Sequence, residues 1–117
     1  MVEINCIPLS GRGKPIHAIC EVGGYCDVTW GKTSFRFPYS FFNEILDIFF
    51  ENHGWYPLGA TFTQPWKGLG KFMIEHQKYF PPSPKYASAI AAIMVKLDLI
   101  EFRELLTSGH PIELRKR

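Results

Sequence analysis

Two short motifs in this 117-residue chain combine glycine with lysine, as phosphate-binding loops do. Gly31-Lys32-Thr33 ends like such a loop, but the loop requires a glycine five residues before Gly31, where Cys26 stands. The second motif, Ser-Gly-Arg-Gly-Lys at positions 10–14, lacks the strand-to-helix context of a nucleotide-binding loop. We therefore do not expect nucleotide binding by a phosphate-binding loop at either motif.

The titratable side chains form no local catalytic or metal-binding pattern. The four histidines, at positions 17, 53, 76 and 110, fall in four different predicted elements without the short spacings of a metal site. Asp47 is predicted on an exposed helix face, and Asp98 at a helix end. A Cys20–His17 nucleophile pair lacks an activating neighbour. We expect no enzymatic activity, no metal and no cofactor.

The chain has three cysteines, an odd number without a Cys-x-x-Cys motif, which argues against a disulfide framework or a zinc module. Cys6, Cys20 and Cys26 all lie in strand-like runs, where a free cysteine is usually a small core residue. A Cys6–Cys20 bridge between paired strands stays open as the alternative, expected mainly in a hyperthermophile.

Length and composition predict a single α+β domain over residues 1–117, with one core and 46% hydrophobic residues. The 15% aromatic content indicates either a core of large side chains or an aromatic surface for a partner. No apolar run approaches the roughly 18 residues of a membrane span, and the first residues lack a basic leader, so we expect a cytoplasmic protein without a membrane partner.

The net charge of +2 is unevenly distributed: residues 1–65 carry −2 and residues 66–117 carry +4. This asymmetry favours an anionic partner for the second half, although a solvated basic face explains it equally well.

Residues 1–38 are predicted to form an antiparallel β-meander, with strands at 2–9, 16–22, 25–30 and 34–38. Gly23-Gly24 predicts a type I′ turn, because that turn needs a positive φ at both central residues.

Residues 39–117 are predicted to form three helices and a hairpin. The first helix is capped by Ser40 and ends at Gly54; the second spans 65–79 and starts at Pro65; the third spans 84–97, with Ser83 as its cap. The aromatic connection at 55–64 can form a short edge strand. The final hairpin pairs IEFREL with IELRKR across a loop at 107–111.

This element order, and the junction KLDLIEFRE where the third helix passes into a strand, resemble the winged helix-turn-helix superfamily. The resemblance covers residues 39–116 and implies an α+β domain in which a β-meander precedes three helices and a C-terminal wing. It also implies binding of double-stranded DNA, with the third helix in the major groove and the wing on the phosphate backbone.

The resemblance to winged helix-turn-helix proteins implies five base-facing positions in this sequence, which are Lys85, Ser88, Ala89, Ala92 and Lys96. The phosphate contacts are Lys67, Lys71, Arg103, Arg115, Lys116 and Arg117. Because the base-facing positions lack the Arg, Asn and Gln side chains that read bases, we expect a transcriptional or DNA-associated accessory protein of modest sequence specificity.

The alternative is a non-catalytic protein-interaction or assembly module on the same scaffold. In that case Ser88, Ala89 and Ala92 pack against a second chain, with a homodimer as one form. Exposed aromatic residues between the first two helices would favour this alternative; they are Trp55, Tyr56, Phe62 and Trp66. Neither hypothesis includes a small-molecule substrate.

Overall fold

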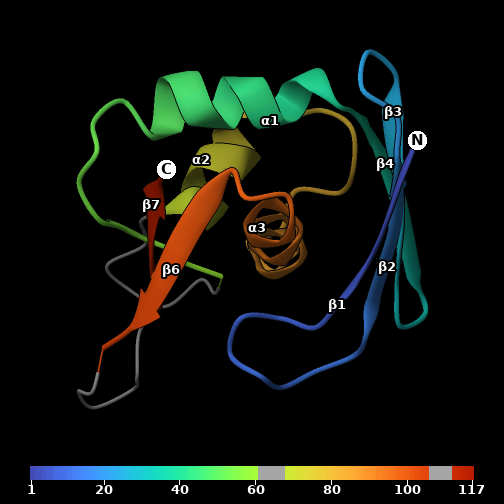
Figure 1. Ribbon diagram of the computed structural model, residues 1–117, viewed down its shortest axis with the longest axis horizontal. Helices are drawn as coiled ribbons and strands as arrows, with labels where there is room; N and C mark the ends of the chain where they lie inside the picture. Colours follow the sequence, from blue (N-terminus) through green and yellow to red (C-terminus); the bar gives the residue numbers. More distant parts are fainter. Residues whose placement is uncertain (61–67, 106–111) are drawn as a thin grey trace.

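The computed structural model describes residues 1–60, 68–105 and 112–117. Within these ranges the chain is an α+β protein with two antiparallel sheets, one of four strands and one of three. Helix α3 (Tyr86–Lys96) lies between the two sheets, in contact with β1 of the first and β6 of the second (Figure 1). No helix in the described ranges has the length and apolar character that a bilayer crossing requires.

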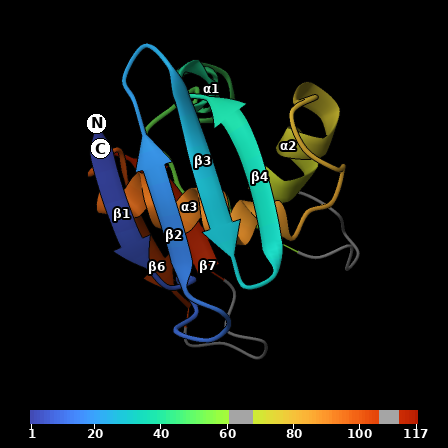
Figure 2. The ribbon, with the colours of Figure 1, turned by 90° about the vertical axis from the view of Figure 1, so that its right-hand side faces the viewer.

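The predicted meander is confirmed. Its strands β1 (Val2–Cys6), β2 (Ile16–Cys20), β3 (Tyr25–Trp30) and β4 (Thr33–Pro38) pair in sequence order, and Figure 2 shows this sheet face-on in front of α3. Alternate residues such as Ile4, Ala18 and Val28 are buried, and their neighbours along each strand are exposed or half-buried. Because buried and exposed residues alternate along each strand, one face of the sheet packs against the core.

The β2–β3 hairpin is confirmed, but the predicted type I′ turn is wrong. Glu21 N–H donates to Tyr25 O at 3.0 Å, and Gly24 N–H donates to Glu21 O at 2.9 Å. The loop between the paired residues Glu21 and Tyr25 therefore has three residues instead of two. In this longer connection Gly23 has the left-handed φ of +83°, and Gly24 does not have a positive φ.

The expectation of free cysteines holds for Cys6 but is wrong for Cys20 and Cys26, which form a disulfide, and the alternative Cys6–Cys20 bridge is wrong. The strand register explains this pairing. Cys20 faces Cys26 directly across β2 and β3, with their Cα atoms 4.1 Å apart. Cys6 faces Ile16, at the opposite end of β2 from Cys20, and so cannot reach it.

The first helix consists of α1 (Ser40–Glu44) and a π-helical segment, η1 (Ile45–Phe49). The predicted end at Gly54 is wrong, because Phe50 leaves the helix at φ −89° and ψ 54° and is completely buried. Ser40 is the first helical residue rather than its cap. Helix α2 spans Leu69–His76; the predicted start at Pro65 lies outside the described residues.

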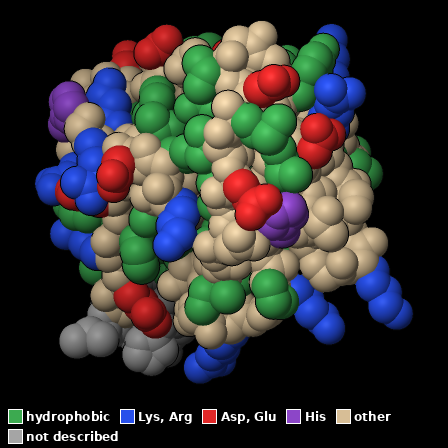
Figure 3. All heavy atoms as spheres, turned by 45° about the vertical axis from the view of Figure 1, so that its right-hand side comes forward, with side chains coloured by type: hydrophobic (Ala, Val, Ile, Leu, Met, Phe, Trp, Pro, Cys, Tyr) green, Lys and Arg blue, Asp and Glu red, His purple; other side chains and the backbone are tan. Residues whose placement is uncertain are grey.

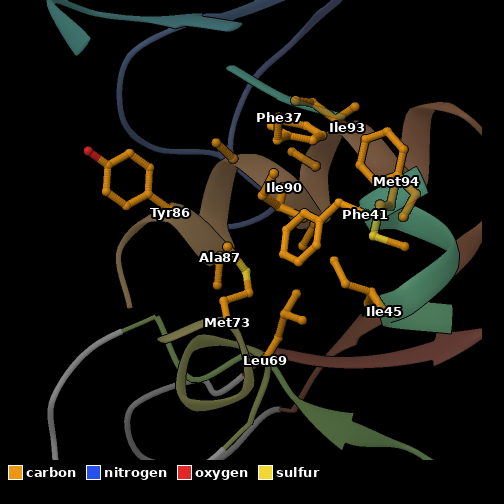
Figure 4. Packing of buried hydrophobic residues seen from close by; sticks show 14 of the residues in the cluster. Phe37, Phe41, Ile45, Leu69, Met73, Tyr86, Ala87, Ile90, Ile93 and Met94 are labelled. Carbon is orange, nitrogen blue, oxygen red and sulfur yellow. The ribbon is translucent and has the colours of Figure 1, made fainter. Parts of the chain in front are cut away.

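Helix α3 begins within two residues of its predicted start, but the expected outward face is wrong. Ala89 and Ala92 are 0% and 3% exposed, and Ser88 is half-buried. Figure 4 shows Ile90 lying between Phe37 of the sheet and Leu69 of α2. Small side chains let a helix pack closely on several neighbours, so this face contributes to the core.

The second sheet contains β5 (Tyr56–Pro57), β6 (Ile100–Glu104) and β7 (Ile112–Lys116), in the order β5-β7-β6. It confirms the predicted edge strand and the predicted C-terminal hairpin, whose loop lies outside the described residues. Asp98, with φ of +60°, turns the chain from α3 into β6, a conformation that aspartate tolerates better than most residues.

Candidate functional site

The predicted base-reading positions do not form one exposed surface on α3. Lys85 and Lys96 are exposed, but they flank the two ends of the helix, roughly 16 Å apart at 1.5 Å per residue. Ala89 and Ala92, between them, are buried. Helix α3 therefore lacks the continuous exposed face that a recognition helix needs in a major groove.

The two arginines of the C-terminal hairpin are neutralised within the second sheet. Arg103 Nε lies 2.9 Å from Glu113 Oε1, and Arg115 Nε lies 2.7 Å from Glu101 Oε1. Both guanidinium carbons also lie over the Trp55 ring, at 4.3 and 4.5 Å from its centroid. A guanidinium that is both paired and stacked on an aromatic ring has less capacity for a phosphate.

The remaining predicted phosphate contacts are distributed over several elements. Lys71 is half-buried on α2, and Lys116 is half-buried on β7. Arg117 is exposed, and its backbone N–H donates to Leu99 O at 3.2 Å. Lys67 lies outside the described residues.

A different group of lysines shares one concavity of about 460 Å³. It lies at the end of the four-stranded sheet opposite α1, where the β1–β2 loop and the β3–β4 turn approach the start of α3 (Figures 1 and 2). We call it the lysine pocket, and the residues that line it are Gly13, Lys14, Trp30, Gly31, Lys32, Thr33 and Lys85. Figure 3 shows Lys and Arg side chains projecting from this lower edge of the molecule.

The strand register brings Lys14 to the β3–β4 turn. Ile16 pairs with Trp30, so the residues just before β2 lie beside the residues just after β3. Gly31 has a φ of +60°, and a Cβ placed on it would lie 2.9 Å from Lys14 Cγ. Glycine at this position therefore provides both the left-handed turn and the space that the Lys14 side chain occupies.

Aromatic packing brings Lys85 to the same pocket. Trp30 meets Tyr86, the first residue of α3, edge-on at 6.5 Å between ring centroids. Lys85 precedes Tyr86, and its Nζ lies 5.4 Å from the Tyr86 ring centroid. Anchoring of Tyr86 in the core thus holds the backbone of the third lysine, Lys85, beside the pocket.

The described lining of the pocket is positively charged, because it contains three lysines and no acidic residue. Among the described residues, no carboxylate forms an ion pair with Lys14, Lys32 or Lys85. Three ammonium groups around one concavity attract an anion more strongly than each does alone. The walls are largely apolar. Trp30 and the lysines, with their methylene stems, are the lining residues with the longest apolar side chains.

Sequence reasoning had separated the parts of this site. Lys14 and Lys32 belong to the two glycine–lysine motifs, and Lys85 was assigned to the third helix. The argument against a phosphate-binding loop still holds, because the turn at Gly31 joins two strands instead of a strand and a helix. The repeated Gly-Lys pairs were the signal, but only the strand register shows that they share one pocket.

One other chemically distinctive side chain among the described residues lies outside this pocket. Burial raises the pKa of the free Cys6 thiol, and the positive charge of Lys96 partly offsets that rise. In the part of the chain that the structure describes, no three His, Cys, Asp or Glu residues come together as metal ligands would.

The chain matches no protein-family model, and no curated protein or solved structure is significantly similar to it. The geometry and charge of the lysine pocket are therefore the basis for assigning a function.

Proposed function

We propose that the lysine pocket of this protein binds the phosphate backbone of DNA, and that the protein is a DNA-associated accessory protein with modest sequence specificity. The observation that carries the proposal is the presence of three lysines around one concavity, with no acidic residue among its described lining residues. Lysine side chains neutralise phosphates without reading the base sequence, and this accounts for the modest specificity.

We also propose that residues 39–117 have a winged helix-turn-helix arrangement. The order helix, strand, helix, helix, strand, strand supports this, as does the β5-β7-β6 pairing of the second sheet. In this molecule β1 of the N-terminal sheet contacts α3, and the residues in the middle of the helix are buried. The DNA contact is therefore assigned to the start of the helix, at Lys85, together with the two turns beside it.

The test is binding of a mixed-sequence 20-base-pair duplex at about 50 and 200 mM salt. The affinity of the wild-type protein should fall steeply with salt, because bound phosphates release counterions. The variant Lys14→Gln/Lys32→Gln/Lys85→Gln should bind weakly, with a salt slope lower by roughly two to three. Lys78→Gln is the matched control, since Lys78 is exposed and does not line the pocket.

Two results would overturn this function. The first is no binding of the wild-type protein to the duplex at about 50 mM salt. The second is a triple variant that keeps both the affinity and the salt slope of the wild type, since the phosphates would then contact other residues.

A second candidate is a protein-interaction module, favoured by apolar side chains at the β2–β3 hairpin. Val22 is 75% exposed and Tyr25 is 48% exposed, although both are hydrophobic. The aromatic surface expected between the first helices is not observed at Trp55, which the two arginines cover; Phe62 and Trp66 lie outside the described residues. Sedimentation velocity tests self-association: a strict monomer would exclude the homodimer.

A further inference from the structure

We propose that the lysine pocket holds one unpaired nucleotide, with the base against Trp30 and the phosphate among Lys14, Lys32 and Lys85. This inference rests on the proposed DNA binding and defines which part of a nucleic acid enters the site. The ligand chemistry is a heterocyclic base joined through a sugar to a phosphate. A single-stranded segment and a free mononucleotide can both supply it.

The size and lining of the pocket fit this ligand. Its volume of about 460 Å³ lies in the range of small-molecule sites, about 300–1,000 Å³, and exceeds what a phosphate alone would fill. The ammonium groups of its three lysines match the charge of a phosphate, whereas Trp30 and the lysine stems match a flat apolar ring. An inorganic anion would leave the apolar part of the pocket unoccupied.

Trp30 is held in position for stacking. It is half-buried, and its contact with Tyr86 is edge-on, with 65° between the ring planes. Tyr86 is only 4% exposed and packs against Phe35 and Phe80, so it forms a rigid support. A fixed aromatic side chain loses little conformational freedom when a base stacks on it, and the stacking accepts any base.

The Lys14 side chain lies close to the turn that follows Trp30. Its Cβ and Cγ atoms lie against the Gly31 backbone, 3.3 and 2.9 Å from where a Cβ on Gly31 would be. Because Gly31 follows Trp30 directly, the stem of Lys14 passes beside the turn that carries the indole. A base on Trp30 and a phosphate near the Lys14 ammonium would then be neighbours, as they are in a nucleotide.

This geometry discriminates between single and double strands. In a duplex each base is paired and stacked, so contact with Trp30 requires the base to be extruded, which carries a free-energy cost. An unpaired base needs no extrusion. The lysines contact phosphates in both forms, and so the pocket should bind duplex DNA more weakly than single strands.

The experiment compares four probes by competition at about 50 mM salt. They are an eight-nucleotide single strand, a closed dumbbell duplex with no free ends, adenosine monophosphate and inorganic phosphate. Wild-type protein should bind the single strand about tenfold more tightly than the dumbbell, an effect of the size that one stacked base provides. Adenosine monophosphate should compete better than inorganic phosphate, because only the nucleotide carries a base.

Substitutions of Trp30 separate stacking from charge. Trp30→Leu should weaken single-strand binding about tenfold and dumbbell binding by a clearly smaller factor, because only an unpaired base stacks on the indole, while Trp30→Phe should keep most of the single-strand affinity. Thermal melting shows whether each variant folds. If Trp30→Leu does not fold, the wild-type comparison of single strand with dumbbell, together with Trp30→Phe, decides the question.

The possible results distinguish this inference from the proposed function. Equal wild-type affinities for single strand and dumbbell would overturn the inference and leave DNA binding intact, as would a folded Trp30→Leu variant with unchanged single-strand affinity. Binding of adenosine monophosphate without binding of either DNA would support the pocket as a free-nucleotide site and overturn the DNA-binding function. Absence of binding to all four probes would overturn both.

Discussion

The C-terminal hairpin and the lysine pocket are both rich in cations, yet they differ in what surrounds the charges. In the hairpin, Arg103 and Arg115 are each paired with a glutamate on the neighbouring strand and lie over Trp55. In the pocket, the lysines surround a concavity without a carboxylate among its described lining residues. The hairpin thus satisfies the charges of its two arginines, whereas no described carboxylate pairs with the lysines of the pocket.

This difference shows why charge counted along the sequence is a poor guide to an interface. The C-terminal half has the positive balance, but its hairpin arginines contribute to cross-strand stability. Lys14 and Lys32, by contrast, belong to residues 1–65. The net charge of that half is negative because its acidic residues, which lie outside the pocket, outnumber its basic ones. The local arrangement of charges, rather than their sum, determines where an anion can bind.

The largest expected effect is the loss of DNA binding when the pocket is neutralised. Lys14→Gln/Lys32→Gln/Lys85→Gln should lower duplex affinity at about 50 mM salt on the order of 10²-fold, because three phosphate contacts are lost. Arg103→Gln/Arg115→Gln should change it by no more than about twofold. Fluorescence anisotropy with a labelled duplex measures both. A larger loss from the arginine pair would reverse the comparison.

Removal of the Cys20–Cys26 disulfide should affect stability without affecting the pocket. Closing a short loop of about seven residues lowers the entropy of the unfolded chain, so Cys20→Ala/Cys26→Ala should reduce the free energy of unfolding by about 2 kcal/mol. The bond lies at the end of β2 opposite Ile16, which pairs with Trp30. Urea denaturation gives the stability, and unchanged DNA affinity would confirm that the two ends are independent.

Gly31→Ala should disturb the pocket more than another glycine substitution with the same backbone strain. An alanine there adopts an unfavourable positive φ, costing about 1 kcal/mol, and its Cβ displaces Lys14. Gly11→Ala is the matched control, because Gly11 has a φ of +79° and nothing within 4 Å of an added Cβ. Both variants should lose stability, but only Gly31→Ala should lose DNA affinity, by several-fold. Equal losses of affinity would indicate that Lys14 does not contribute.

The smallest expected effect comes from freeing the hairpin arginines. Glu101→Gln/Glu113→Gln removes two partly exposed ion pairs and should lower stability by about 1 kcal/mol in total. The released arginines should then add duplex affinity, with a measurable increase in the salt slope. An unchanged slope would show that Trp55, rather than the glutamates, keeps these arginines from phosphate. The single variant Trp55→Leu tests that alternative directly.

Local sequence signals predicted most of the elements of this fold. Alternating apolar residues and glycine turns identified all four strands of the meander, because these signals depend on neighbouring residues. The end of the first helix was missed, since burial of Phe50 overrode the stop signal at Gly54. The disulfide was missed because its partners are determined by strand register, which the turn length at Gly23 sets.

The sequence by itself determined the strands, the start of α3 and the C-terminal hairpin, since side-chain period and local backbone preferences act over a few residues. It did not determine which face of α3 meets solvent. Alanine is compatible with either environment, and only the packing of β1, β6 and α2 against α3 decides that Ala89 and Ala92 are buried. The lysine pocket is likewise a product of tertiary structure: the β2–β3 register brings Lys14 to Gly31, and the packing of Tyr86 on Trp30 brings Lys85 to the same pocket.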